Sequence, residues 1–187
     1  MGIRDSRLWL AGALVWGFAE ATFFFIVPDL LLTAAAVLFG LSRAFRLSVT
    51  AALAAAAGGL LMALWGASDA STARAFLLSV PLVGEDLLLR VHGEMEGLWP
   101  AGLTLGAITG APFKIYAVEA GAASVNPLLF ALAGFAARLA RFSLAIGLTA
   151  LGVALARRLG LGCIVPYGLA LVWAGIYAFY VGARLAA

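Results

Sequence analysis

Hydrophobic residues occupy this chain in long stretches that are separated by short charged turns. The five stretches cover residues 8–40, 47–66, 98–125, 126–155 and 161–182. Each reaches or exceeds the length of about 20 apolar residues that a helix needs to cross the hydrocarbon core of a bilayer. The pattern therefore predicts an all-α polytopic integral membrane protein.

Two of the stretches carry a break. Residues 8–40 would measure about 50 Å as one straight helix, against a hydrocarbon core of about 30 Å. Pro28 interrupts this stretch beside Asp29, and proline removes a helix hydrogen bond and disfavours helix at the preceding residue. The third stretch is interrupted in the same way at Pro112, two residues before Lys114. Irregular backbone at this depth needs protein or water around it, so each break predicts a re-entrant hairpin, which enters the membrane and returns.

The charged turns predict how the stretches are oriented. Arginine pairs lie at Arg4 and Arg7, at Arg43 and Arg46, and at Arg157 and Arg158. The positive-inside tendency places all three pairs on the cytoplasmic side, so the first hairpin enters and leaves on that side. The second stretch then crosses outward and the fourth crosses back, which leaves Arg184 on the opposite side from the pairs.

These signals predict a single membrane domain over residues 1–187 that contains two inverted repeats. Residues 8–66 form the first repeat, a re-entrant hairpin followed by a transmembrane helix, and residues 98–157 form the second. An acidic interfacial segment, residues 67–97, joins them, and a C-terminal transmembrane helix covers residues 161–184. Repeats of opposite orientation are typical of secondary transporters, which bind their substrates near the bilayer midplane.

Local signals refine these boundaries. Asn126 followed by Pro127 predicts a helix start, with the asparagine as N-cap and the proline at the first helical position. Pro81 and Gly84 predict an interruption within the interfacial segment. The small residues that precede Gly66 predict close packing of the second stretch against another helix.

The composition supports a membrane protein and excludes several classes. Hydrophobic residues make up 65% of the chain and charged residues only 11%, whereas a soluble domain carries about 25% charged residues. The net charge of +3 is mild and its arginines are scattered over the turns, which argues against a nucleic-acid-binding surface. Cys163 is the only cysteine, so an intrachain disulfide and a cysteine-based metal site are excluded, and no cofactor is predicted. Arginine replaces lysine everywhere except at Lys114, a bias typical of GC-rich bacterial genomes.

Six ionisable residues inside or beside the apolar stretches are the candidates for chemistry. They are Glu20, Asp29, Lys114, Glu119, Arg138 and Arg141. Charges in hydrocarbon are costly, so such residues normally face a cavity or pair with one another, which three acids and three bases can do. Opposed hairpin tips would bring the break at Pro28 and the break at Pro112 together near the midplane, where we expect the substrate site.

A structural role is the alternative for each candidate. Arg138 or Arg141 could extend to the interface or hold Glu20 in a structural pair, whereas a charge at a broken helix is harder to explain by packing. Glu119 fits either role, and His92, in the acidic segment, is expected to be an ordinary exposed histidine. The sequence has no serine–histidine–aspartate arrangement, phosphate-binding glycine loop or histidine cluster, so we do not expect an enzyme.

The two breaks resemble motifs of the DedA family, whose wider superfamily is called SNARE-associated or VTT. Residues 18–29 are similar to the first motif, in which a glutamate, here Glu20, precedes a proline-rich break that ends in an acidic residue, here Asp29. Residues 110–114, followed by residues 120–121, resemble the second motif in the form used by the small YqaA-like branch.

The neighbouring helices extend this resemblance over roughly residues 15–155. Asn126 and the Arg138-x-x-Arg141-Phe142 run match the following helix of the YqaA-like branch, and residues 58–66 are similar to its glycine-rich helix. Six positions depart from the family's motifs: Ala21, Thr22, Phe25, Val27, Thr109 and Ile115. The last two stand where the larger DedA branch has arginine, so the substrate of that branch transfers only weakly.

The resemblance implies translocation of undecaprenyl phosphate or a phospholipid between the leaflets of the bacterial inner membrane. The charges agree with this function: we expect Lys114 and an arginine to hold the phosphate head group, and Glu20 and Asp29 to accept protons or to pair with the bases when the site is empty. Proton coupling and homo-oligomerisation are left open. A small-solute or ion transporter with a closed aqueous vestibule and a membrane scaffold are the alternative functions.

Overall fold

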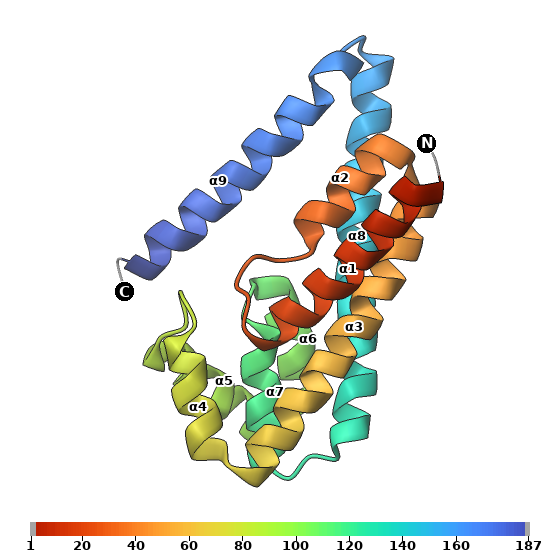
Figure 1. Ribbon diagram of the computed structural model, residues 1–187. Coiled ribbons are helices and arrows are strands. Elements are labelled where there is room, and N and C mark those ends of the chain that lie inside the picture. Colours follow the sequence, from red (N-terminus) through yellow and green to blue (C-terminus); the bar gives the residue numbers. More distant parts are fainter. Residues whose placement is uncertain (1–2, 186–187) are drawn as a thin grey trace.

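The computed structural model describes residues 3–185, without the side chains of residues 3–5, 108 and 183–185, and this part of the chain is a helical bundle with no strand (Figure 1). Its helices are α1 (Ile3–Thr22), α2 (Asp29–Phe39), α3 (Leu41–Ser68), α4 (Ala70–Ser79), α5 (Glu85–Glu96), α6 (Trp99–Thr109), α7 (Phe113–Ala122), α8 (Pro127–Arg158) and α9 (Val165–Leu185), with a 3-10 turn, η1 (Gly162–Ile164), before α9. The predicted all-helical fold is confirmed.

Three helices of the described chain are long and apolar enough to cross a membrane. They are Leu41–Ser68, Pro127–Arg158 and Gly162–Gly182. In the apolar window of the third, no residue is buried within the protein. Leucines such as Leu148 and Leu151 of α8 are also largely exposed, as expected where lipid rather than water covers the surface.

Both predicted breaks interrupt the helices. Residues 23–28 separate α1 from α2, and Pro28 directly precedes the first residue of α2. Gly110 ends α6 in the left-handed conformation with φ 84°, and Pro112 precedes α7. The two helix pairs differ in length, because α1 has 20 residues and α6 has 11. A third interruption separates α4 from α5 around Pro81 and Gly84, as predicted.

The ends of the helices agree with the distribution of arginine. The start of α1, the α2–α3 junction and the end of α8 lie at one end of the bundle (Figure 1). Arg7, Arg46 and Arg157 therefore share that end, while the α3–α4 turn and the residues between α7 and α8 lie at the other (Figure 1). The side chains of Arg4 and Arg184 lie outside the described residues. Asn126 caps α8 by accepting hydrogen bonds from two backbone N–H groups, which confirms the predicted helix start.

Helix α3 is the centre of the bundle and packs against α1, α7 and α8. Small residues make these contacts close: Ala51, Ala52 and Ala55 are fully buried. A Cβ at Gly121 of α7 would collide with the carbonyl oxygen of Ala63 in α3. Close approach of this kind requires small side chains on both helices.

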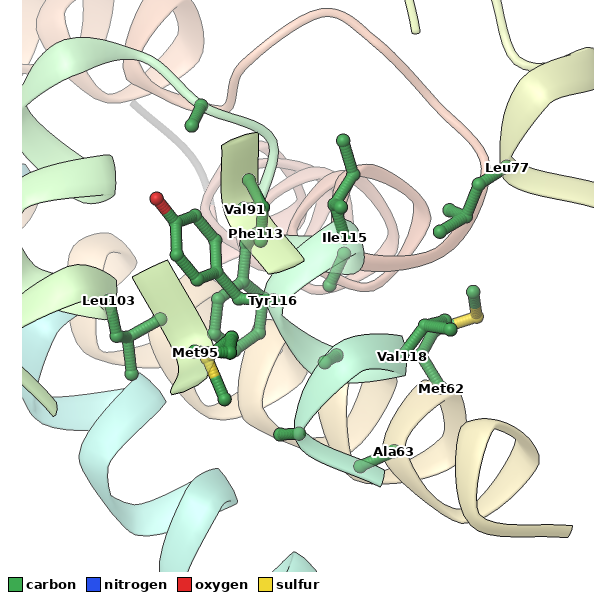
Figure 2. Close-up of a cluster of buried hydrophobic side chains, with 14 of the residues drawn as sticks. Met62, Ala63, Leu77, Val91, Met95, Leu103, Phe113, Ile115, Tyr116 and Val118 are labelled. Atoms are coloured by element: carbon green, nitrogen blue, oxygen red, sulfur yellow. The ribbon is translucent and has the colours of Figure 1, made fainter. Parts of the chain in front are cut away.

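Helix α7 is buried on all sides, with every residue from Phe113 to Gly121 shielded. Figure 2 shows its side chains meeting Met62 of α3, Leu77 of α4, and Val91 of α5. The interfacial segment α4–α5 is therefore a layer that covers α7, held by an apolar face of its own. We infer that α4 and α5 are part of the core.

Replacement of Gly121 by alanine tests this close packing. Gly→Ala in a helix interior normally stabilises by about 0.5–1 kcal/mol, yet the α3 backbone leaves no room for a methyl group at this position. We expect Gly121→Ala to destabilise the protein by about 1–3 kcal/mol, the usual cost of overpacking. Thermal unfolding in detergent measures the effect. Gly152→Ala in α8, where the described structure leaves open space, is the control and should not destabilise.

Candidate functional site

The first break leaves backbone groups without hydrogen-bond partners in a helix. Side chains of α1, α9 and α7 form hydrogen bonds with these groups. The indole N–H of Trp16 donates a 2.8 Å hydrogen bond to the carbonyl of Ile26. The hydroxyl oxygen of Tyr177 in α9 accepts one of 2.9 Å from the N–H of Val27. Buried backbone polar groups are costly without partners, so these bonds hold the irregular segment in one conformation.

Lys114 is the third side chain that bonds to the backbone of the first break, and it connects this break to the second one. It lies in the first turn of α7, directly after the second break, and is 1% exposed. Its Nζ donates hydrogen bonds of 3.0 and 2.9 Å to the carbonyls of Glu20 and Phe24, at the end of α1. The ammonium group thus lies at the negative end of a helix, where a cation is favoured. Two of its three donors are used in this way.

A buried ion pair lies beside Lys114. Nη2 of Arg138 in α8 donates a 2.8 Å hydrogen bond to Oε1 of Glu20 and lies 2.7 Å from Oε2. The guanidinium of Arg138 also lies over the ring of Phe113, 4.7 Å from its centre. Both charged side chains are almost fully buried, and Nη1 of Arg138 has no hydrogen-bond partner among the described residues.

A second ion pair joins α2 to α8. Nη2 of Arg141 lies 3.1 Å from Oδ2 of Asp29, the first residue of α2. Asp29 is buried, whereas 21% of the Arg141 side chain remains exposed. An acidic residue in the first turn of a helix is also favoured by the helix dipole. The structure therefore brings together five of the six ionisable candidates at the meeting point of the two breaks.

Glu119 lies elsewhere. Its carboxylate receives two hydrogen bonds of 2.7 Å from Arg74 of α4, and Nδ1 of His92 lies 2.7 Å from its Oε2. His92 is exposed, as expected, but it is not an ordinary surface residue, because its ring also contacts the buried carboxylate of Glu119. The hydrogen bond to Glu119 raises the pKa of Arg74 above its usual value, so the guanidinium stays charged. The sequence did not predict Arg74 or His92 as site residues. The signal that points to them is Glu119 itself, because an acidic residue in an apolar stretch requires a basic partner.

A cavity of about 110 Å³ opens next to the charged cluster. Glu20, Lys114 and Arg141 contribute the charged part of its wall, and Trp173 and Tyr177 of α9 close another side. Residues of both breaks and of the α4–α5 turn line the remainder. A cavity of this size holds several water molecules, and its wall presents cationic donors to whatever occupies it.

No family model, curated protein or solved structure matches this chain. The resemblance of the two breaks to the DedA family stays a prediction. The function must therefore be argued from the contacts and charges of the site.

The buried pair of Glu20 and Arg138 gives a stability prediction. Removing one partner of a buried pair leaves an uncompensated charge and typically costs about 3–5 kcal/mol. We expect Arg138→Met alone to destabilise the protein by about that amount. The double variant Glu20→Gln, Arg138→Met should recover a large part of the loss, because neither member of the pair is left as a buried charge without its partner. Thermal unfolding in detergent measures both; equal losses in the single and double variants would contradict the pairing.

The Arg74–Glu119 contact predicts how the α4–α5 layer is held. We expect Arg74→Ala to increase hydrogen exchange of the α4 and α5 amides by about tenfold or more, since loss of a charge-assisted bond exposes a buried carboxylate. Hydrogen-exchange mass spectrometry in detergent measures this. Arg90→Ala is the control, because Arg90 is half exposed and lies 3.5 Å from Glu94 on its own helix. Equal exchange in the two variants would show that the contact of Arg74 with Glu119 does not hold the layer.

Proposed function

We propose that this protein moves a lipid phosphate between the leaflets of the bacterial inner membrane, and that its head group passes the point where the two breaks meet. The charge balance of the cluster is the observation that carries this proposal. Lys114, Arg138 and Arg141 bring three positive charges, and Glu20 and Asp29 bring two negative ones. The cluster therefore has a net charge of one positive unit in a buried position, and a bound anion would compensate it.

Two of the three bases are positioned to reach such an anion. Lys114 and Arg141 both line the cavity, whereas Arg138 is held against Glu20 behind them. Among the described residues, two of the three ammonium donors of Lys114 have an acceptor, and Arg141 contacts Asp29 through one nitrogen. Charge-assisted hydrogen bonds from arginine and lysine are the usual means of holding a phosphate.

Asp29 offers Arg141 a partner when no phosphate is bound. Asp29 and Arg141 are paired across the wall of the cavity, so a phosphate that binds Arg141 competes with the aspartate. Exchange between an internal carboxylate and a mobile phosphate lets the head group enter and leave without exposing a bare charge to hydrocarbon. Protonation of Asp29 would release Arg141 in the same way, which is the route by which protons would couple to transport.

The helix arrangement supports an inverted-repeat transporter of the DedA type. The first break is reached from the end that carries the start of α1, and α7 leads from the second break to the opposite end (Figure 1). Each pair of short helices is followed by a helix of membrane length, α3 or α8. We propose that both pairs are re-entrant hairpins whose tips meet within the bilayer, as in transporters that bind substrates at broken helices.

Leaflet exchange in proteoliposomes tests the proposal. The assay follows a fluorescent polyprenyl phosphate or phosphatidic acid, with wild type compared with Arg141→Gln, Lys114→Ala and Asp29→Asn. We expect Arg141→Gln to slow exchange by about tenfold or more, because one charge-assisted hydrogen bond to the phosphate is worth about 1.5–3 kcal/mol. Arg46→Gln, at the end of the bundle, should exchange at the wild-type rate.

Thermal unfolding of each variant separates loss of function from loss of fold. This matters most for Lys114→Ala, because Lys114 also holds the end of α1. Exchange by folded wild-type protein no faster than in empty vesicles would overturn the proposal.

The closed ion pairs favour an assembly or scaffold role as the second candidate. If the pair of Asp29 and Arg141 serves only the fold, the double variant Asp29→Asn, Arg141→Gln should restore what either single variant loses. A transporter that binds phosphate through Arg141 should not be restored, because the double variant still lacks the cation. The double variant therefore distinguishes the two functions.

A further inference from the structure

Helix α9 stands apart from the bundle and leaves a groove along α2. Figure 1 shows α9 turning back from the end of α8 and running at an angle to that helix. The groove has a volume of about 490 Å³ and is open to the outside of the bundle. Side chains from both helices line it, among them Leu30, Ala34, Val37, Leu169, Ala170 and Ala174, and none of the described residues in its wall is charged.

The groove adjoins the charged cavity, and the two spaces share part of their walls. Trp173 and Tyr177 line both spaces. Their polar atoms tie α9 to the first helix pair: the indole N–H of Trp173 donates a 2.9 Å hydrogen bond to Thr33, and Tyr177 accepts one from Val27. The apolar groove and the cavity walled by Lys114 and Arg141 thus lie against the same two aromatic side chains.

The dimensions and the opening fit a single lipid chain. The groove runs along α9 from Pro166 to Tyr177, a rise of about 17 Å at 1.5 Å per residue. This is close to half of a hydrocarbon core of about 30 Å, the depth of one leaflet. An apolar trough with a cationic end has the polarity of a lipid whose phosphate lies at that end.

We infer that the α2–α9 groove binds one acyl or prenyl chain of the lipid whose phosphate contacts Arg141 and Lys114. This inference rests on the proposed head-group site, and it adds that the protein holds the chain as well. The protein then recognises its substrate from both ends, and a free phosphate or a soluble phosphate ester lacks half of the contacts. Helix α9 is the element that makes the substrate a lipid.

Photolabelling of the full-length protein tests the groove. The probe is phosphatidic acid with a diazirine in the middle of one acyl chain, in phosphatidylcholine vesicles, and mass spectrometry locates the labelled residues. We expect label on the groove residues of α2 and α9 that excess unlabelled phosphatidic acid competes away and that Arg141→Gln lowers about tenfold. Label at Leu171, which is 73% exposed and outside the groove wall, measures bulk lipid and should not change with either treatment.

A variant that fills the groove tests its role in lipid exchange in the same vesicles. Ala170→Trp puts a large ring into the groove, and we expect about tenfold slower lipid exchange, as for the loss of roughly two buried methylene groups. Leu171→Trp is the matched control on the neighbouring face of α9 and should exchange as wild type. The binding of inorganic phosphate should be the same in both variants, because the head-group site is intact.

The outcomes separate the groove from the proposed function. Groove label that neither competes nor depends on Arg141 would show bulk lipid only and overturn the inference, even if lipid exchange itself requires Arg141. No label in the groove, with Leu171 labelled, would show that another part of the protein or a second copy covers it, and would also overturn the inference. Competed, Arg141-dependent label without lipid exchange would retain the binding groove and remove the transport function.

Discussion

The structure depends on how two broken helices satisfy their backbone groups inside an apolar bundle. The end of α1 offers carbonyls that no helix hydrogen bond uses, and the ammonium group of Lys114 bonds two of them. Trp16 and Tyr177 supply partners for two more groups of the same break. Because unpaired polar backbone is so unfavourable away from water, these contacts determine where the second break can lie relative to the first. Lys114 is therefore a structural residue as well as a wall of the cavity.

The buried charges follow from this arrangement. Once Lys114 lies at the end of α1, Glu20 is beside it, and α8 passes close enough for Arg138 and Arg141 to pair with Glu20 and Asp29. Within each pair the two charges cancel, so the positive charge of Lys114 is the one that remains. A site that is almost balanced can release an anionic head group as readily as it binds one, which a transporter requires. The same balance also stabilises the fold, so under the proposed function stability and transport draw on the same side chains.

The covering elements decide what reaches this site. On one side, α4 and α5 close over α7, held by apolar packing and by the contact of Arg74 with Glu119. On the other side, α9 touches the first break through Trp173 and Tyr177 and otherwise stands away from the bundle. On that side the site is thus bounded by a single helix, in whose apolar window no described residue is buried. This asymmetry is the structural reason to look for a substrate that arrives from the membrane.

The sequence by itself determined the helical class, the membrane-length segments, both breaks and the start of α8, because apolar length, proline and capping residues act over a few neighbouring positions. It also marked the ionisable residues that a bilayer would not tolerate alone. Only the tertiary structure decided the partners: Glu20 with Arg138, Asp29 with Arg141, and Glu119 with Arg74 and His92. Three acids and several bases on different helices allow many pairings of similar local energy. The packing of α7 between α3 and the α4–α5 layer selects one of them.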